Sequence, residues 1–177
     1  MKKLKVIELG NKVLRQKSKK VSRAEILSKK FQNFCDELIQ TCKEKNGVGI
    51  AAPQVGVLKH VCIVWSRPNK RYKKIPKMEP EVVINPILIP LGKKQKKEFE
   101  GCLSIPGIRG LVPRYTKILV TYTNRKGEKC EAVCVDFVAR IFQHEIDHLE
   151  GIVFLDRTNP KDLVTESEYQ KIIKKKK

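Results

Sequence analysis

The stretch that decides the fold is residues 136–151, which read Asp-Phe-Val-Ala-Arg-Ile-Phe-Gln-His-Glu-Ile-Asp-His-Leu-Glu-Gly. Its apolar residues recur at helical spacing, Asp136 can serve as the N-cap, and Gly151 can end the helix. His144 and His148 are four residues apart, so both side chains project from one face of that helix. The sequence therefore predicts a helix that directs two imidazoles toward one point.

The pattern His144-Glu145-Ile146-Asp147-His148 is typical of a metal-binding helix. Two imidazoles one turn apart can hold one divalent ion, and Glu145 can lean over its open side and accept a proton from water. The alternative is an ordinary helix that happens to contain histidines. Only three histidines occur in the chain, so this pattern is rare by chance, and we favour the metal site.

A catalytic metal site usually has three protein ligands, so a third is needed. Downstream of His148 the chain offers no histidine or cysteine, only the carboxylates of Glu150, Asp156, Asp162, Glu166 and Glu168. Upstream, Cys102 lies in Glu100-Gly-Cys-Leu-Ser104, where a flexible glycine precedes the thiol and a loop of 41 residues separates it from His144. A lone cysteine is more often buried than liganding, but Cys102 is the best candidate.

A third motif is Gly47-Val-Gly-Ile-Ala-Ala-Pro-Gln54. Its two glycines, two alanines and proline predict a compact turn in which the backbone approaches another group closely, and Gln54 then presents an amide donor. Without the other motifs, a helix stop followed by a loop would be the better explanation of the two glycines.

The three motifs in this order, G-V-G-I-A-A-P-Q, E-G-C-L-S and Q-H-E-I-D-H-L-E-G, resemble those of the peptide deformylase family, from about Val6 to Arg157. The departures are mild: Ile50 stands where leucine is commoner, and Gly10–Arg15 lacks a proline often found there. The resemblance implies an α+β fold in which antiparallel sheets pack around the helix that carries H-E-x-x-H. It also implies removal of the formyl group from the N-terminal formylmethionine of new polypeptides, with release of formate.

The resemblance implies roles for individual residues. Cys102, His144 and His148 are expected to bind the metal, Glu145 to act as general acid and base, and Gln54 with the Leu103 amide to stabilise the oxyanion. The residues expected to line the substrate site are Val48, Gly49, Glu100, Gly101, Arg109, Phe137, Arg140 and Ile141. Ferrous iron is the implied metal, while a thiolate with two imidazoles also suits Zn²⁺, Ni²⁺ or Co²⁺ in a purified sample.

Helix geometry adds one expectation about the substrate pocket. Arg140 and Phe137 lie four and seven residues before His144, so they share its side of the helix. Phe137, Ile141, Val48 and the aliphatic stem of Arg140 are predicted to form an apolar slot for methionine, with the guanidinium reaching water at the rim. The alternative is that Arg140 is a solvated helix residue.

The rest of the chain predicts one domain over residues 1–177. Ser22 and Glu25 form a capping-box pattern that predicts one helix ending near Asn46-Gly47, with Leu27, Cys35 and Cys42 on its apolar face. Branched residues predict strands over 61–65, 82–89, 118–123 and 129–135. A short basic segment, residues 166–177, is expected to be a helix that frays at its end.

Composition limits the partners and the location. Lys and Arg outnumber Asp and Glu by 38 to 19, and the net charge of +19 favours electrostatic association with ribosomes, although a lysine-rich proteome explains it equally well. No apolar run approaches the roughly 20 residues that span a membrane. Six cysteines without an export signal predict free thiols and a cytoplasmic location, or an organelle if a transit peptide was removed. We expect neither a membrane nor DNA as partner.

Two other functions use the same motifs. A zinc endopeptidase shares the H-E-x-x-H helix but usually takes a ligand further along the chain, which is missing here. An RNA-binding protein with a structural metal would explain the charge, but such a site usually closes with a fourth protein ligand, and Glu145 would have no task. The substrate distinguishes the first from a deformylase: an internal peptide bond or a formylated N-terminus.

Overall fold

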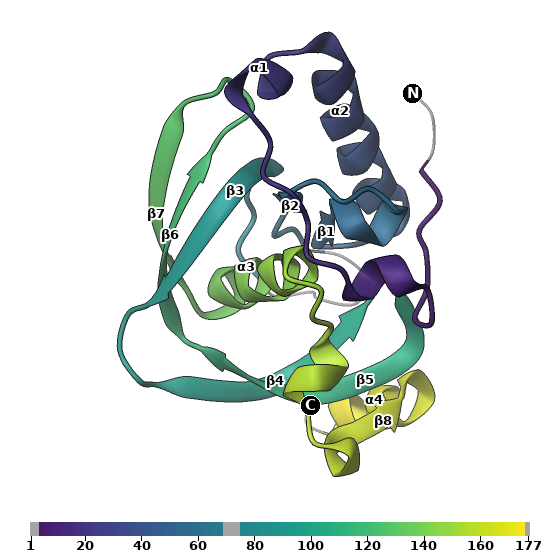
Figure 1. The fold of residues 1–177 in the computed structure, drawn as a ribbon. Helices are drawn as coiled ribbons and strands as arrows, with labels where there is room; N and C mark the ends of the chain where they lie inside the picture. The colour runs from purple at the N-terminus through teal and green to yellow at the C-terminus, as the bar shows by residue number, and fades with distance from the viewer. Residues whose placement is uncertain (1–3, 69–74, 176–177) are drawn as a thin grey trace.

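The computed structural model describes residues 4–68 and 75–175. Within these residues the structure has short 3-10 helices, four α-helices and eight strands (Figure 1). The α-helices are α1 (Arg23–Ile26), α2 (Lys29–Glu44), α3 (Asp136–Leu149) and α4 (Glu166–Lys175), and the 3-10 helices are Lys12–Arg15, Ala52–Val55, Phe154–Arg157 and Pro160–Asp162. The strands are β1 (Gly49–Ala51), β2 (Val61–Val64), β3 (Glu81–Pro90), β4 (Gln95–Cys102), β5 (Ile105–Tyr115), β6 (Lys117–Thr123), β7 (Lys129–Val135) and β8 (Leu163–Thr165).

The strands form two sheets in which every pair is antiparallel. One sheet has the order β1-β2-β3-β6-β7, and the other has the order β4-β5-β8. Figure 1 shows α3 at the centre of the molecule, and α3 contacts strands of both sheets. The α+β fold, with antiparallel sheets packed around the helix that carries His144 and His148, is as the resemblance implied.

Helix α3 is held at the centre by the apolar side chains along its length. Ala139, Ile141, Phe142 and Leu149 pack into one core with side chains of β2, β3, β6 and β7, including Cys62, Val83, Ile118 and Val120. Each of these residues is at most 3% exposed. The polar residues on the other faces of α3 are buried as well, among them Arg140, Glu145 and His148.

The start of α3 differs from the prediction. Asp136 is not the N-cap: Val135 occupies that position with an extended backbone, and Asp136 is the first helical residue, with φ of +46°. The reason is that β7 runs directly into α3, so the turn between them falls on Asp136 itself. Its carboxylate still lies in the first turn, where its negative charge interacts favourably with the positive end of the helix dipole. Gly151 follows the helix end with φ of +76°, as predicted.

The predicted N-terminal helix is two helices. Ser22 does cap a helix start, since its side chain accepts a hydrogen bond from the Glu25 amide. That helix lasts one turn, because Ser28 caps a new helix by accepting from the Phe31 amide. Leu27 lies at the break and is 55% exposed, so its assignment to the apolar face was wrong, whereas Cys35 and Cys42 are fully buried as predicted.

All four predicted strands are present within one residue at either end, but strands β1, β4, β5 and β8 were not predicted. Strands β4 and β5 were not predicted because β4 is rich in lysine, which is uncommon in strands, and β5 contains prolines, which cannot donate a hydrogen bond to a ladder. Strand β8 pairs only with Ile108–Gly110 of β5, so Pro113 lies where one side of β5 has no neighbour. Cys102 is the last residue of β4.

The basic C-terminal segment forms α4, which ends at Lys175; residues 176–177 lie outside the described residues. All six cysteines are free, as predicted. Within residues 4–68 and 75–175, no helix is both long and apolar enough to cross a membrane.

Candidate functional site

Cys102, His144 and His148 meet at one point, although β4 and α3 are far apart in sequence. Their potential ligand atoms all lie within 4.8 Å of one another. The Cys102 Sγ atom is 3.2 Å from Nε2 of His148, and the two imidazole rings stand 5.0 Å apart at 77°. Among the described residues this is the one cluster of at least three such side chains with metal-ligand geometry.

Local structure explains how the thiol reaches the helix. The pairing of β4 with β5 is irregular between Glu100 and Cys102. An irregularity of this kind bends a strand and redirects the side chain that follows it, and it is common beside active sites. Cys102, which is 7% exposed, therefore faces α3 at the point where β4 ends.

The chemistry of the donor set fits a divalent transition metal. A thiolate and two imidazoles are ligands that iron, zinc, cobalt and nickel share. His148 is 1% exposed, and its Nδ1 is one of three buried side-chain atoms of the described chain that lack a hydrogen-bond partner; Glu145 Oε2 is another. His148 faces Cys102 with Nε2, so its Nδ1 points away from the cluster, whereas Glu145 lines the cavity beside it. Buried polar atoms are seldom left unpaired, so Glu145 Oε2 indicates that the site accommodates a further polar group.

Glu145 is buried against the glycine motif. It is 4% exposed, and a Cβ atom on Gly49 would stand only 2.7 Å from Glu145 Cδ. Burial raises the pKa of the Glu145 carboxyl to about 7, against the opposing charge of His144. A carboxyl group with a pKa near neutrality can both take up and release a proton, as general acid–base chemistry requires. The close backbone approach predicted for this motif is thus made to Glu145.

We expect Gly49→Ala to lower kcat/KM by about 100-fold, because the new methyl group must displace the Glu145 carboxylate, and an error of about 1 Å in a reacting group has an effect of that size. Steady-state kinetics of the variant provides the measurement. Combining Gly49→Ala with Glu145→Gln supplies the control: if the glycine acts through Glu145, the double variant is no slower than Glu145→Gln alone. Additive losses would contradict this explanation.

The amide of Gln54 is fixed toward the thiol. Its Oε1 accepts a hydrogen bond of 2.8 Å from the Ala51 amide, which leaves Nε2 pointing at Cys102 Sγ, 3.3 Å away, and at Ser104 Oγ, 3.2 Å away. Gln54 is 1% exposed. A donor held in this way is already oriented toward any group that enters beside Cys102.

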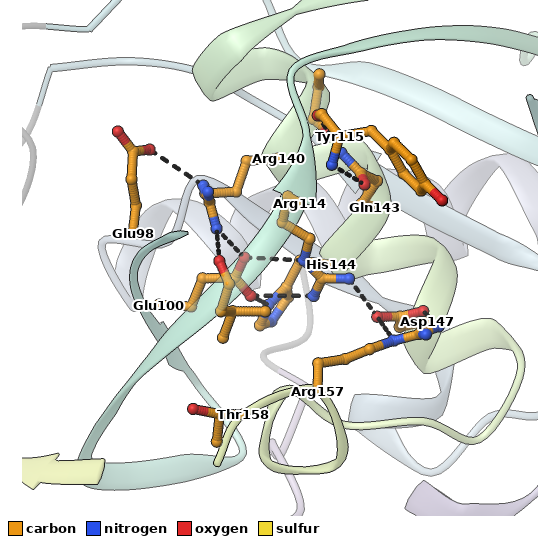
Figure 2. A network of polar contacts seen from close by, with 12 residues as sticks. Glu98, Glu100, Arg114, Tyr115, Arg140, Gln143, His144, Asp147, Arg157 and Thr158 are labelled. Carbon is orange, nitrogen blue, oxygen red and sulfur yellow. Dashed lines mark hydrogen bonds and ion pairs between the residues drawn. The ribbon is translucent and has the colours of Figure 1, made fainter. Parts of the chain in front are cut away.

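A cluster of buried charges lies behind His144 (Figure 2). Glu100 accepts two hydrogen bonds from Arg114, of 2.9 and 3.0 Å, one of 2.7 Å from Arg140, and faces His144 Nδ1 at 2.9 Å. Arg114 also reaches Asp147 at 2.5 Å, and Arg157 pairs with the same Asp147 carboxylate at 2.7 Å. The cluster therefore joins α3, β4, β5 and the segment that follows α3.

These contacts determine the charge state of Glu100. Burial alone would raise its pKa, but the hydrogen bond with His144 and the positive charge of Arg114 lower the pKa far below its usual range. Glu100 is thus a carboxylate at any physiological pH, and it orients the His144 ring so that Nε2 faces Cys102. A carboxylate behind a histidine is a frequent outer partner in metal sites.

A cavity opens beside the cluster, and the structure places most of the predicted substrate-site residues around it. Its lining comprises Asn46, Gly47, Val48, Gly49, Gln54, Glu100, Gly101, Cys102, Leu103, Phe137, Arg140, Ile141, His144 and Glu145. Asn46 was assigned only to a helix stop and Gly47 also to the glycine motif, but neither was expected in the substrate pocket. His148, which is 1% exposed, is not part of the lining.

Two predicted pocket residues are placed differently. Arg109 does not line this cavity: it is 2% exposed, pairs with Glu166 of α4 at 2.6 Å and stacks on Tyr169. Arg140 does reach the cavity, but its guanidinium is not at a solvated rim. It is 6% exposed and is hydrogen-bonded to carboxylates and carbonyls of β4 and β5, so the expectation that it reaches water was wrong.

The chain is similar to one protein family over nearly its whole length. The sequence model of that family, described as polypeptide deformylase, matches residues 3–164. Peptide deformylase 2 of Nostoc sp. is 48% identical over 173 residues, which cover 97% of this chain and 96% of the relative. Peptide deformylase of Leptospira biflexa is 37% identical, with 86% of each chain covered.

Solved structures give the same similarity. The Met-Ala-Ser-bound class I type b peptide deformylase from Acinetobacter baumannii superposes with a TM-score of 0.86 at 42% identity, covering 88% of this chain and 98% of that one. The actinonin-bound form of the same enzyme gives a TM-score of 0.82 at 38% identity, with 90% of this chain and 100% of that chain covered.

Proposed function

This chain belongs to the polypeptide deformylase family, and from that premise we propose how its own residues carry out the reaction. The protein is a metal-dependent hydrolase that removes the formyl group from the N-terminal formylmethionine of new polypeptides. The observation that carries this conclusion is the convergence of Cys102, His144 and His148 beside Glu145 and a cavity. Glutamate, thiolate and two imidazoles form a hydrolytic site, and the cavity gives a substrate access to it.

Cys102, His144 and His148 would hold the metal, with Glu100 orienting His144 from behind. When bound, a divalent ion supplies Lewis acidity, which polarises a carbonyl group and lowers the pKa of water. Family resemblance favours Fe²⁺ in the cell, and the donor set also suits Zn²⁺, Ni²⁺ or Co²⁺. Cys102 and His144 also line the cavity, so a substrate bound there would have access to the metal.

Glu145 is the residue that moves the proton. We infer that its buried carboxylate takes a proton from the attacking water, whose oxygen forms the new bond to the formyl carbon. The bond between that carbon and the methionine nitrogen then breaks, Glu145 returns the proton to the nitrogen, and formate leaves with a free amine. The pKa of about 7 suits both transfers.

Gln54 and Leu103 stabilise the developing charge. The Gln54 Nε2 group is held beside Cys102 by the Ala51 contact, and Leu103 follows Cys102 in the cavity lining. We propose that Nε2 and the Leu103 backbone amide donate to the formyl oxygen as it becomes negative. One such donor contributes roughly 3 kcal/mol to lowering the barrier.

The methionine side chain requires an apolar surface. Val48, Phe137 and Ile141 lie around the same cavity, and Gly49 and Gly101 also belong to its lining. We propose that these residues form the methionine site. Arg109, which lies outside the cavity, and the guanidinium of Arg140, which is bonded to protein groups, are removed from that set.

The test is steady-state hydrolysis of a formyl-Met peptide, with metal analysis of the same sample. We expect turnover of the formylated peptide, release of formate, and no cleavage of an internal peptide bond. An N-acetyl-Met peptide is the matched control, because it differs from the formylated peptide only by a methyl group on the carbonyl carbon that reacts. Cleavage of internal bonds in place of deformylation would support a zinc endopeptidase instead.

We also propose a cytoplasmic location, based on the free cysteines. The net charge of +19 and α4, whose last turn carries Lys174 and Lys175, support a further proposal, that the protein associates with ribosomes. We expect the protein to cosediment with purified ribosomes at low salt and to dissociate steeply as salt rises, because release of counterions drives such binding. Sedimentation at about 50 and 200 mM salt measures this. Failure to sediment with ribosomes at low salt would contradict the proposal.

A further inference from the structure

We propose that Arg140 is a positioning residue for the metal centre: it ties α3 to β4 and β5 and thereby fixes His144 relative to Cys102. This inference rests on the proposed metal site. It departs from the role that helical spacing had suggested, in which Arg140 faced the substrate at the pocket rim.

The hydrogen bonds of Arg140 connect α3, which carries it, to β4 and β5. Its Nη1 donates to Glu100 Oε1 at 2.7 Å and to the Val112 carbonyl at 2.9 Å. Its Nη2 donates to the Lys96 carbonyl at 2.6 Å, and its Nε donates to Glu98 at 3.2 Å. One side chain of α3 therefore bonds to both carboxylates and one carbonyl of β4 and to one carbonyl of β5.

Helix geometry connects these contacts to the metal site. Arg140 and His144 are one turn apart on α3, so they lie on the same face. Both meet Glu100, Arg140 at Oε1 and His144 at Oε2. Glu100 is two residues from Cys102 on β4. Figure 2 shows the guanidinium of Arg140 directed at Glu98 and Glu100 from the side of the helix.

The contribution of Arg140 differs from that of Arg114. Arg114 extends from β5 and holds both oxygens of Glu100, so Glu100 keeps a cationic partner when Arg140 is removed. Removal of Arg140 instead deletes its own hydrogen bonds to β4 and β5 and leaves the carbonyls of Lys96 and Val112 without this donor, while the contacts of Arg114 with Asp147 and of His144 with Glu100 remain. A buried acceptor that loses its partner is destabilised, and the strand end can then move relative to the helix.

A lysine at position 140 would replace this function only in part. Its ammonium group is a point charge on a flexible stem, whereas the planar guanidinium offers five donors in a fixed arrangement. We therefore expect a graded series in which the geometry of the metal centre worsens from arginine to lysine to leucine. If Arg140 were needed only for its charge, Arg140→Lys would have the same cobalt spectrum and cobalt affinity as the wild type.

The test uses cobalt-substituted protein, because the visible absorption of Co²⁺ reports its coordination geometry independently of turnover. The proteins compared are wild type, Arg140→Lys, Arg140→Leu and Phe31→Leu. Phe31 is 2% exposed in α2, so its replacement lowers stability through a distant core defect and serves as the control. The measurements are the cobalt spectrum, the equilibrium retention of cobalt against a chelator, and the thermal midpoint of each protein.

We expect Arg140→Leu to alter the spectrum and to weaken cobalt binding by about 10-fold or more, the range found for outer partners of metal ligands. Arg140→Lys should lie between Arg140→Leu and wild type, and Phe31→Leu should melt earlier with an unchanged spectrum. An unaltered spectrum and cobalt affinity in Arg140→Leu would overturn the inference; if that variant does not fold, the same result in Arg140→Lys would do so. Wild-type protein without a thiolate–cobalt band would overturn the metal site itself and the positioning role with it.

Discussion

Glu145→Gln is expected to lower kcat for deformylation by about 10²- to 10⁴-fold, the contribution of a positioned general acid–base group. The amide has nearly the shape of the carboxylate but cannot take a proton from water or return one to the leaving amine. The metal ligands are unchanged, so metal content should stay near that of the wild type. Steady-state rates and metal analysis of the same preparation measure the two quantities separately.

Glu131→Gln is the control for this prediction. Glu131 is an exposed residue of β7, so its replacement removes the same charge without touching the site. Near-normal turnover in Glu145→Gln would show that another group moves the proton. Loss of the metal together with turnover would show that Glu145 acts as a ligand or supports one.

The sequence predicts the centre of the fold well because its signals there are local. The apolar spacing of residues 136–151 defines a helix, and two histidines four residues apart on any helix share one face. The order of the three motifs then indicates the family, and the family supplies the antiparallel sheets. Cys102 could be selected only as the best remaining candidate, because its approach to α3 depends on the pairing of β4 with β5.

The buried charges were not predictable in the same way. Helical spacing placed Arg140 on the side of His144, which is correct, but spacing does not reveal depth. A buried arginine requires partners for its donors, and those partners belong to β4 and β5, which the sequence did not reveal as strands. Glu98 and Glu100 had no signal that they faced α3, and Arg114 and Asp147 were not singled out.

The glycine motif shows an intermediate case. Gly47 and Gly49 predicted that the backbone comes close to another group, and the structure confirms such an approach at Gly49. The sequence could not identify Glu145 as that group, since the contact joins β1 to α3. Glycines in a sequence therefore predict where the backbone can come close to another group, but the identity of that group depends on how distant elements pack.

Cys102→Ala is expected to weaken metal binding by more than about 100-fold, because loss of an outer partner alone weakens it by 10- to 100-fold and the thiolate is a direct ligand in the proposed site. Without the sulfur, His144 and His148 alone remain, and two imidazoles do not complete a catalytic set. Equilibrium dialysis of Co²⁺ against the variant measures the loss. The protein should stay folded, since Cys102 is the last residue of β4 and alanine leaves its backbone pairing with Ile105 unchanged.

Two other cysteines provide the matched controls. Cys130 and Cys134 both lie on β7, Cys130 partly exposed and Cys134 buried, so they test a thiol in each environment. Neither belongs to the cluster of potential ligand atoms, so Cys130→Ala and Cys134→Ala should bind cobalt as the wild type does. Equal loss in all three variants would require a different set of ligands. Loss in Cys102→Ala alone would identify the single thiolate that the metal uses.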